Sequence, residues 1–270
     1  MRRKEWFELH DHRLFPGFLR DLITDALQAM WNSIHSYRGI VPKLQAALKE
    51  AGTRRIVDLC SGGGGPWLRL YPELTKDDTS PVSVFLTDKY PNKRAFEHAQ
   101  TVNGINFHQT SVDATQIPAE LDGFRTIFTS FHHFSPSDAR ASLADAVAQN
   151  RGIGVFETPN FHVSTLLVTM LVPLICLCLT PGIRPFRWSR LLWTYLLPVV
   201  PLVLVVDGIL SCLRAYSLED LRELTHGLGE GYCWDVGRAQ GGYVGVTYLI
   251  GRPCAGPAME PALASEVSSI

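Results

Sequence analysis

From Arg55 to Pro66 the chain reads RIVDLCSGGGGP, an apolar run that leads directly into four consecutive glycines. The apolar run predicts a buried strand, and a helical pattern begins at Trp67. Glycine permits a tight turn and lets the backbone approach a ligand closely, while the N-terminus of the following helix offers free N–H groups. The stretch therefore predicts a strand–turn–helix unit that binds a ligand against bare backbone.

Further apolar strands alternate with helical segments along the chain. Strand patterns lie at 82–88, 106–111, 125–131 and 152–157, and helical patterns at 21–51, 92–102 and 136–150. A helix capped by Ser217 precedes two closing strands at 233–236 and 243–250. Such alternation implies right-handed βαβ units and a parallel sheet with both faces covered. The sequence therefore predicts an α/β fold.

The glycine bend differs from two common phosphate-binding motifs. A P-loop is excluded because no Lys-Ser or Lys-Thr follows the glycines. A dinucleotide fingerprint placed on 60–65 lacks its first glycine, and the other register puts bulky Trp67 where the helix approaches the strand. A nicotinamide-dependent oxidoreductase is therefore kept only as an alternative.

Four motifs in order resemble those of one enzyme family. The segment VDLCSGGG at 57–64 resembles the first motif of the class I S-adenosylmethionine-dependent methyltransferases, an acid followed by small residues alternating with glycine. Asp88 stands where that family places the acid that binds the ribose hydroxyls. Asp-Ala at 113–114, followed by Ile-Pro at 117–118, resembles the element beside the adenine. The segment 128–134 resembles the fourth-strand motif that faces the methyl group.

This resemblance covers roughly residues 55–160 and, more faintly, 217–252. It implies a Rossmann-like methyltransferase sheet with S-adenosyl-L-methionine as cofactor, bound where loops after parallel strands meet at the carboxyl ends of the sheet. The cofactor-binding residues that it implies are Asp58, Cys60, Gly62, Gly64, Asp88, Asp113, Ala114 and Ser130. Two roles stay open for Asp58, which either touches the aminoacid part of the cofactor or only orients the glycine bend. Cys60 is expected to fill space rather than to act as a nucleophile.

Candidate catalytic residues follow the fourth and fifth expected strands. Methyl transfer from a sulfonium mainly needs alignment of donor and acceptor, with a base where the acceptor loses a proton. His132 and His133 are candidates for that base, and continued strand geometry would point only one of them into the site; simple packing is the alternative. Glu157 would orient a histidine or the substrate, or else be a solvated strand end. Because the fourth strand lacks an Asn-Pro-Pro-Tyr type motif, an oxygen or carbon acceptor is favoured over the amine of a nucleic-acid base.

An apolar insertion follows the fifth strand. The runs 163–179 and 191–206 contain no charged residue, and each is near the lower length limit for crossing a bilayer. We expect a hairpin that dips into one leaflet, with Arg184, Arg187, Arg190, Trp188 and Trp193 at the headgroup level. One alternative is a hairpin that spans the bilayer. The other is a buried cap or dimer interface that encloses a lipophilic substrate. In each case the insertion predicts a lipophilic acceptor.

Composition and residue spacing exclude several other classes. The formal net charge is -1, so nothing favours a nucleic-acid partner. The six cysteines show no paired CxxC spacing, which predicts reduced thiols rather than disulfides. Neither His10-x-His12 nor the His132-His133 pair belongs to a set with metal-ligand spacing, so no metal is expected. The first twenty residues lack the apolar run of a secretory signal, which predicts residence in the cytosol.

Together these features predict four parts. They are an N-terminal helical lid at 1–51, a cofactor-binding domain at 52–160 and 214–253, the apolar insertion at 161–213 and a disordered tail at 254–270. The predicted function is O- or C-methylation of a lipophilic small molecule at the cytoplasmic face of a membrane, by a chain that could form a homodimer. The alternatives are an NAD(P)-dependent oxidoreductase and a non-catalytic membrane-bound scaffold.

Overall fold

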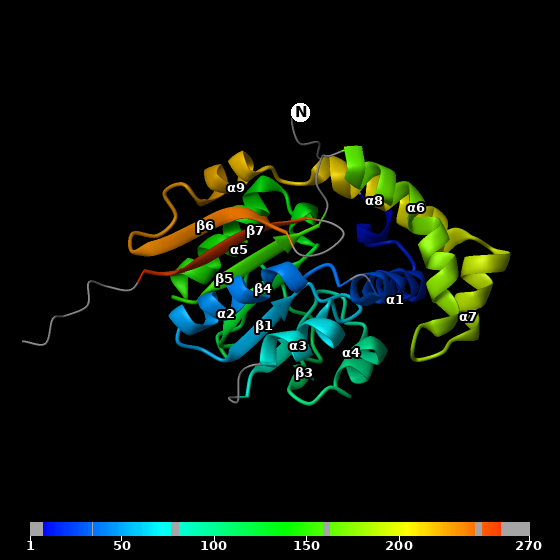
Figure 1. The fold of residues 1–270 in the computed structure, drawn as a ribbon, viewed down its shortest axis with the longest axis horizontal. Helices are drawn as coiled ribbons and strands as arrows, with labels where there is room; N and C mark the ends of the chain where they lie inside the picture. Colours follow the sequence, from blue (N-terminus) through cyan, green and yellow to red (C-terminus); the bar gives the residue numbers. More distant parts are fainter. Residues whose placement is uncertain (1–7, 34, 77–80, 159–162, 241–244, 255–270) are drawn as a thin grey trace, which may run out of the picture.

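The computed structural model describes residues 8–33, 35–76, 81–158, 163–240 and 245–254 of the 270-residue chain. Its core is a seven-stranded sheet with the order β3-β2-β1-β4-β5-β7-β6 (Figure 1). The strands are β1 Arg55–Leu59, β2 Ser83–Leu86, β3 Ile105–Phe107, β4 Phe124–Phe128, β5 Ile153–Glu157, β6 Tyr232–Ala239 and β7 Val246–Pro253. Strands β1 to β5 are parallel, whereas β7 runs antiparallel to both β5 and β6. The predicted α/β sheet is confirmed, with one reversed strand near its edge.

Helices cover both faces of this sheet. Successive side chains of a strand point to opposite faces, so the neighbours Ile56 and Val57 of β1 belong to two different hydrophobic clusters. The Ile56 cluster packs under α2 Val41–Glu50, α3 Trp67–Thr75 and α4 Lys93–Ala99, and the Val57 cluster packs under α5 Pro136–Ala148 and α9 Leu218–Thr225. The Ser217 hydroxyl accepts the Asp220 N–H at 3.1 Å, and the Asp220 carboxylate accepts the Ser217 N–H at 2.9 Å. The start of α9 is therefore capped by Ser217 as predicted, and Asp220 makes the cap reciprocal.

Strand β4 ends earlier than its apolar pattern suggests. We expected a strand over 125–131, but the strand stops at Phe128 and Thr129 adopts a positive φ of 44°. A short 3-10 turn, η3 Phe131–His133, follows. Strand geometry therefore does not continue to His132 and His133, so the condition under which only one of them would face the site is not met.

The predicted apolar insertion is a helical hairpin. It comprises α6 Val163–Leu179, the 3-10 turn η4 Thr180–Gly182, α7 Trp188–Leu191, the π-helical turn η5 Leu192–Leu196 and α8 Val199–Arg214. Helices α6 and α8 share a hydrophobic cluster with α1 Gly17–Ser33, and Figure 1 shows these elements grouped beside the sheet. Of the described residues, only the helical stretch Thr165–Gly182 is by itself long and apolar enough to cross a membrane. The segments Trp188–Leu196 and Val199–Arg214 meet at a bend of 71°.

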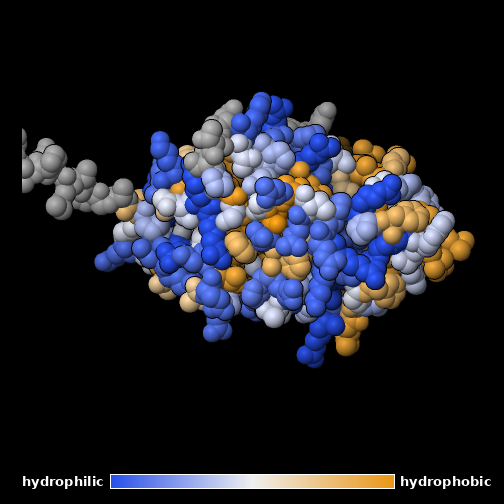
Figure 2. All heavy atoms as spheres, turned by 90° about the horizontal axis from the view of Figure 1, so that it is seen from below, coloured by the Kyte–Doolittle hydropathy of each residue, from blue (hydrophilic) through white to orange (hydrophobic). Residues whose placement is uncertain are grey.

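The outer face of the hairpin is apolar, but one of its arginines is not at the surface. Exposed hydrophobic side chains include Leu167, Leu171 and Leu174 of α6, and Figure 2 shows hydrophobic atoms along this end of the molecule. Arg190, however, is buried and lies 2.6 Å from the Asp25 carboxylate of α1. Its predicted place at the headgroup level is therefore wrong, because a buried carboxylate inside the protein holds it.

One disulfide corrects the cysteine prediction. Cys233 of β6 and Cys254, the residue after β7, are bonded, with 5.1 Å between their Cα atoms. Their 21-residue separation shows no CxxC signal, yet the antiparallel pairing of Tyr232 with Pro253 brings the two strand ends together. The other four cysteines are free thiols. Residues 255–270, where most of the predicted tail falls, lie outside the described residues.

Candidate active site

A cavity of about 460 Å³ opens at the carboxyl ends of β1, β2 and β4. Most of the predicted site residues line it, namely Asp58, Cys60, Gly62, Asp88, Asp113, Ala114, Ser130, His132 and His133. Among the described residues, Gly64 and Glu157 are the predicted members that do not line it. The loops that follow the parallel strands thus meet at one site, as open α/β sheets require.

The glycine bend forms the floor of the cavity. Gly62, Gly64 and Gly65 have positive φ angles of 52°, 100° and 57°, which suit glycine far better than other residues. Gly63 excludes a side chain for a different reason, since a Cβ there would lie 2.5 Å from the backbone oxygen of Thr24 on α1. The N-terminal helix therefore packs directly on the bend, where it covers the site.

Asp88, two residues after the end of β2, is joined to the glycine bend. One carboxylate oxygen accepts the Gly62 N–H at 2.7 Å and the other accepts the Tyr90 N–H at 2.7 Å. Burial raises the pKa of the Asp88 carboxyl above its usual value. The carboxylate thus lies between the bend and the cavity, with lone pairs still available to a ligand.

Asp58, near the end of β1, is hydrogen-bonded to the first residue of the glycine bend and to β4. Its two carboxylate oxygens accept the hydroxyls of Ser61 and Thr126, each at 2.6 Å. Burial raises the pKa of the Asp58 carboxyl to about 7. Of the two roles that the sequence left open, these contacts support the positioning one, although Asp58 also borders the cavity.

The pKa values of Asp113 and Cys60 are shifted in opposite directions. The Thr115 N–H and hydroxyl, together with the Lys89 ammonium at 3.0 Å, lower the pKa of the Asp113 carboxyl to about 2. Asp113 is therefore an ionised acceptor at the rim of the cavity. Burial, by contrast, raises the pKa of the Cys60 thiol well above its usual value. A protonated thiol is a poor nucleophile, in agreement with the space-filling role expected of Cys60.

His132 and Glu157 form a buried pair. The Nδ1 atom of His132 lies 2.5 Å from Glu157 Oε2, while Glu157 Oε1 accepts the N–H groups of Ser130 and Phe131. Glu157 is therefore not a solvated strand end but a fixed partner of the histidine. Because the 3-10 turn η3 carries these N–H groups, the early end of β4 is what allows the pair to form.

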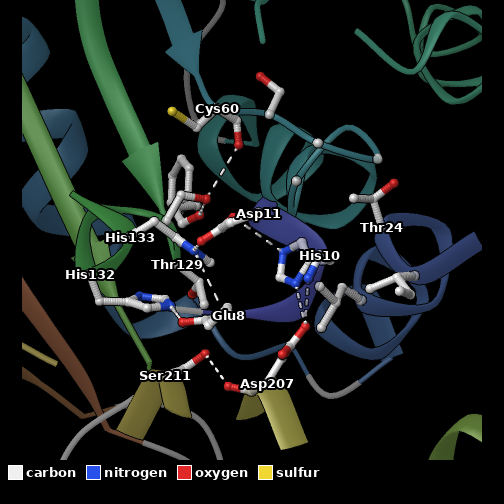
Figure 3. Close-up of a pocket in the computed structure, with 18 of the residues that line it drawn as sticks. Glu8, His10, Asp11, Thr24, Cys60, Thr129, His132, His133, Asp207 and Ser211 are labelled. Carbon is white, nitrogen blue, oxygen red and sulfur yellow. Dashed lines mark hydrogen bonds and ion pairs between the residues drawn. The ribbon is translucent and has the colours of Figure 1, made fainter. Parts of the chain in front are cut away.

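His133 belongs to a second cluster, and Figure 3 shows it near His132, Glu8 and Asp11. Its Nδ1 lies 2.6 Å from Asp11 Oδ2 and 3.7 Å from Glu8 Oε2. Burial opposes protonation of His133, but the carboxylates of Glu8 and Asp11 outweigh it and raise the pKa of the imidazole to about 9. Both histidines thus reach the cavity, each with its own acidic partner.

Several residues of this cluster were missed by sequence reasoning. Glu8, Asp11 and Arg20 line the cavity from the N-terminal region, and Asp207 lines it from α8. Arg214, at the end of α8, donates from Nε to the His132 carbonyl at 3.1 Å and from Nη2 to the His133 carbonyl. One signal could have found Asp207, since it is a single acid that directly follows a long charge-free run.

The far wall of the cavity is apolar. Leu27 and Met30 of α1 contribute to it, together with Val168 and Val172 of α6 and Leu204 of α8. The cavity therefore extends from the polar glycine bend to the hydrophobic hairpin. The end at the glycine bend can bind a polar group, and the end at the hairpin can bind an apolar one.

Comparison with known proteins supports the fold assignment. No family model and no curated protein sequence matches the chain. Among solved structures, the plantazolicin methyltransferase BamL, in complex with a triazolic desmethylPZN analog and SAH, aligns with a TM-score of 0.50 and 11% identity over 87% of this chain and 98% of its own. Human N-acetylserotonin methyltransferase, in complex with SAM, aligns with a TM-score of 0.51 and 14% identity over 89% of this chain. This chain spans just over half of that protein, 57% of its length. At such identities the likeness is one of fold.

Proposed function

We propose that this chain, which has the class I methyltransferase fold, transfers a methyl group from S-adenosylmethionine to an oxygen or carbon atom of a lipophilic small molecule. One observation carries the proposal. The glycine bend, the bend-linked carboxylate of Asp88, the ionised Asp113 and the His132–Glu157 pair all border or support one cavity. The cavity therefore combines a place for a nucleoside with a place for proton transfer.

The polar end of the cavity suits the cofactor. Asp88 would accept the ribose hydroxyls, and Asp113 with Ala114 would lie along the adenine. The bare bend around Gly62 would hold the aminoacid part, with its N–H groups directed by Asp58 through Ser61. Two solved proteins of similar fold carry SAM or SAH, which agrees with this choice of cofactor.

His132 is the proposed base. Its Nδ1 is held by Glu157, so its Nε2 is the atom directed away from that carboxylate. A histidine held in one tautomer by an acid can take a proton from an acceptor hydroxyl as the methyl group is transferred. Glu157 acts through His132 and is a positioning residue rather than a group that touches the substrate.

The apolar wall of the cavity supports a lipophilic acceptor. The exposed apolar face of the same hairpin supports a membrane as the place from which that acceptor is taken. The same helix α6 lines the cavity through Val168 and Val172 and presents Leu167, Leu171 and Leu174 on its outer face. An exposed apolar surface of this kind is costly in water. We place the enzyme on the cytoplasmic face, where the cofactor is made, with the hairpin dipping into the bilayer. The Cys233–Cys254 disulfide is uncommon in that compartment, so cysteine oxidation in cells tests this part of the proposal.

Calorimetry tests the proposed activity against its main alternative. The purified chain should bind S-adenosylmethionine and not NADH or NADPH, and it should transfer a labelled methyl group into a lipid extract. Binding of a nicotinamide cofactor alone would favour an oxidoreductase. Binding of S-adenosylmethionine without any transfer to the extract would favour a non-catalytic scaffold.

A further inference from the structure

Beside the proposed methyl-transfer site, the chain gathers three imidazoles and four carboxylates from distant parts of the sequence. The residues are Glu8, His10, Asp11, His132, His133, Glu157 and Asp207. Figure 3 shows the labelled members turned towards one another at the end of the cavity. An aligned base needs only His132 and Glu157, so the rest of the cluster requires a separate explanation.

We propose that His10, Asp11 and His133 bind a divalent transition-metal ion, with Glu8 as a further ligand. Ligand atoms of the first three residues all lie within 4.8 Å of one another. His133 Nδ1 is 2.6 Å from Asp11 Oδ2 and 3.7 Å from Glu8 Oε2, and His10 Nε2 is 3.9 Å from Asp11 Oδ1. Metal–ligand bonds of about 2.0–2.2 Å place neighbouring ligand atoms about 3 Å apart, so small side-chain movements would complete the site.

Asp207 holds the His10 ring in the way that a carboxylate commonly holds a metal-binding histidine. Its Oδ2 lies 2.7 Å from His10 Nδ1, and its Oδ1 accepts the Leu9 N–H at 2.7 Å. When Nδ1 donates to a carboxylate, the lone pair of the imidazole is on Nε2, the atom that faces Asp11. A carboxylate behind a ligating histidine is the usual means of fixing its tautomer and direction. Asp207 is itself buried, so the orientation is held within the protein.

Glu8 supplies an independent observation. The residue is 1% exposed, and its Oε1 accepts no hydrogen bond from any described residue. A buried carboxylate oxygen in this state is costly unless a cation compensates it. His132 Nε2 is 3.5 Å away, and Arg214 reaches Asp11 only at 3.8 Å. A divalent ion between Glu8, Asp11 and the imidazoles would take the place of the positive charge that Glu8 and Asp11 otherwise stabilise on His133.

The ligand set indicates the kind of ion and its use. Imidazole with carboxylate suits Zn²⁺, Mn²⁺ and similar ions better than Ca²⁺ or Mg²⁺, which prefer oxygen. The ligands line the cavity, so an open coordination position would face the acceptor. A metal-bound hydroxyl loses its proton more easily, which would help His132 to prepare an oxygen acceptor. This use of the metal rests on the proposed function, whereas the binding of the metal does not.

Metal binding to the full chain tests the inference without any turnover. The purified protein is stripped with a chelator, dialysed, and titrated by calorimetry with ZnCl₂ and with MnCl₂, without S-adenosylmethionine. We expect a stoichiometric site for at least one ion. The substitutions His10→Ala and His133→Ala should each weaken its affinity at least tenfold, and Asp207→Asn should weaken it about 10- to 100-fold. His226→Ala, at an exposed histidine beyond α9, is the matched control and should leave the affinity unchanged.

Two further measurements keep the inference falsifiable if the variants fold poorly. Thermal melting monitored by circular dichroism identifies folded variants, and Co²⁺ added to the wild type should give the visible absorption bands of a site with nitrogen and oxygen ligands. A stripped, folded wild type that binds neither Zn²⁺ nor Mn²⁺ and gives no such bands would overturn the proposal. Equal affinities in the wild type and in folded His10→Ala and His133→Ala would also overturn it. Failure to bind S-adenosylmethionine would count against the proposed function alone.

Discussion

Arg190, in the apolar hairpin, lies 2.6 Å from Asp25 in the N-terminal helix α1, and both side chains are buried. Asp25 also accepts a hydrogen bond from Asn92, so the pair joins the hairpin, α1 and the start of α4. Removing Arg190 leaves the buried Asp25 carboxylate with only the more distant guanidinium of Arg187, at 3.7 Å. Arg190→Met should therefore lower the free energy of unfolding by up to about 3–5 kcal/mol in chemical denaturation.

The double variant Asp25→Asn/Arg190→Met tests that reason. It removes both charges, so it should recover most of the stability that Arg190→Met loses. Arg184→Met, at a nearby residue of the same loop, serves as the control. A double variant that is no more stable than Arg190→Met would show that the arginine matters only through packing.

Asp88→Ala should weaken the binding of S-adenosylmethionine at least tenfold while the protein stays folded. The substitution removes the carboxylate that borders the cavity and accepts the Gly62 N–H. Calorimetry measures the affinity, and circular dichroism measures the melting temperature. Glu97→Ala, at an exposed acid of α4, is the control. An unchanged affinity in folded Asp88→Ala would contradict the placement of the ribose.

Asp58 should make stability depend on pH. Its folded-state pKa of about 7 lies above the ordinary carboxyl value, so the folded state binds the proton more tightly than the unfolded state. The unfolding free energy should therefore fall as pH rises from about 4 to about 7, by at most about 1.4 kcal/mol per pH unit from this group. Denaturation across this range should show a flatter profile for Asp58→Asn than for the wild type. Parallel profiles would mean that Asp58 is ionised throughout.

His132→Gln should lower kcat about 10²- to 10⁴-fold on a hydroxyl acceptor, because it removes the proposed base. Glu157→Gln should lower kcat less, because it disturbs only the direction and tautomer of His132, with little change in KM for the acceptor. Rates of labelled methyl transfer measure both, and S-adenosylmethionine affinity should be unaffected. His226→Gln provides the control. If Glu157→Gln changes KM and not kcat, the pair has a role in substrate binding rather than in proton transfer.

Charged substitutions on the outer face of α6 should detach the protein from membranes. Leu167→Asp and Leu171→Asp change side chains that are 64% and 54% exposed, so the fold should survive. Co-sedimentation with phospholipid vesicles should fall sharply for both variants. Leu14→Asp, at a leucine that is 80% exposed outside the hairpin, should bind vesicles like the wild type. Equal sedimentation of all four proteins would contradict the membrane assignment.

The fold could be predicted because its signals are local. Alternation of strands and helices, the glycine bend at 61–65 and the cap at Ser217 can each be recognised within a short stretch of sequence. The end of β4 was misplaced because apolar residues continue to Phe131, while the turn depends on Glu157 from the neighbouring strand. Strand length was thus set by a tertiary hydrogen bond that no local pattern reports.

The site could be predicted only in part, for a related reason. Its strand-end residues follow from topology, which explains why Asp88 and His132 could be predicted to lie at this cavity. Glu8, Asp11 and Asp207 were missed because their meeting depends on how the N-terminal segment and the hairpin dock. The Asp207–His10 contact joins residues 197 positions apart. The Cys233–Cys254 bond was missed for the same reason, since only strand register places the two thiols together.

The position of Asp207 has a consequence for how the protein would respond to its surroundings. Asp207 is in α8, the second arm of the hairpin, and it fixes both the Leu9 backbone and the His10 ring. A shift of α8 would therefore move His10 as well, because the Asp207 carboxylate is bonded to both Leu9 and His10. The apolar helix α8 thus helps to position the proposed site, and a detergent that disturbs this helix should impair the proposed activity before it unfolds the sheet.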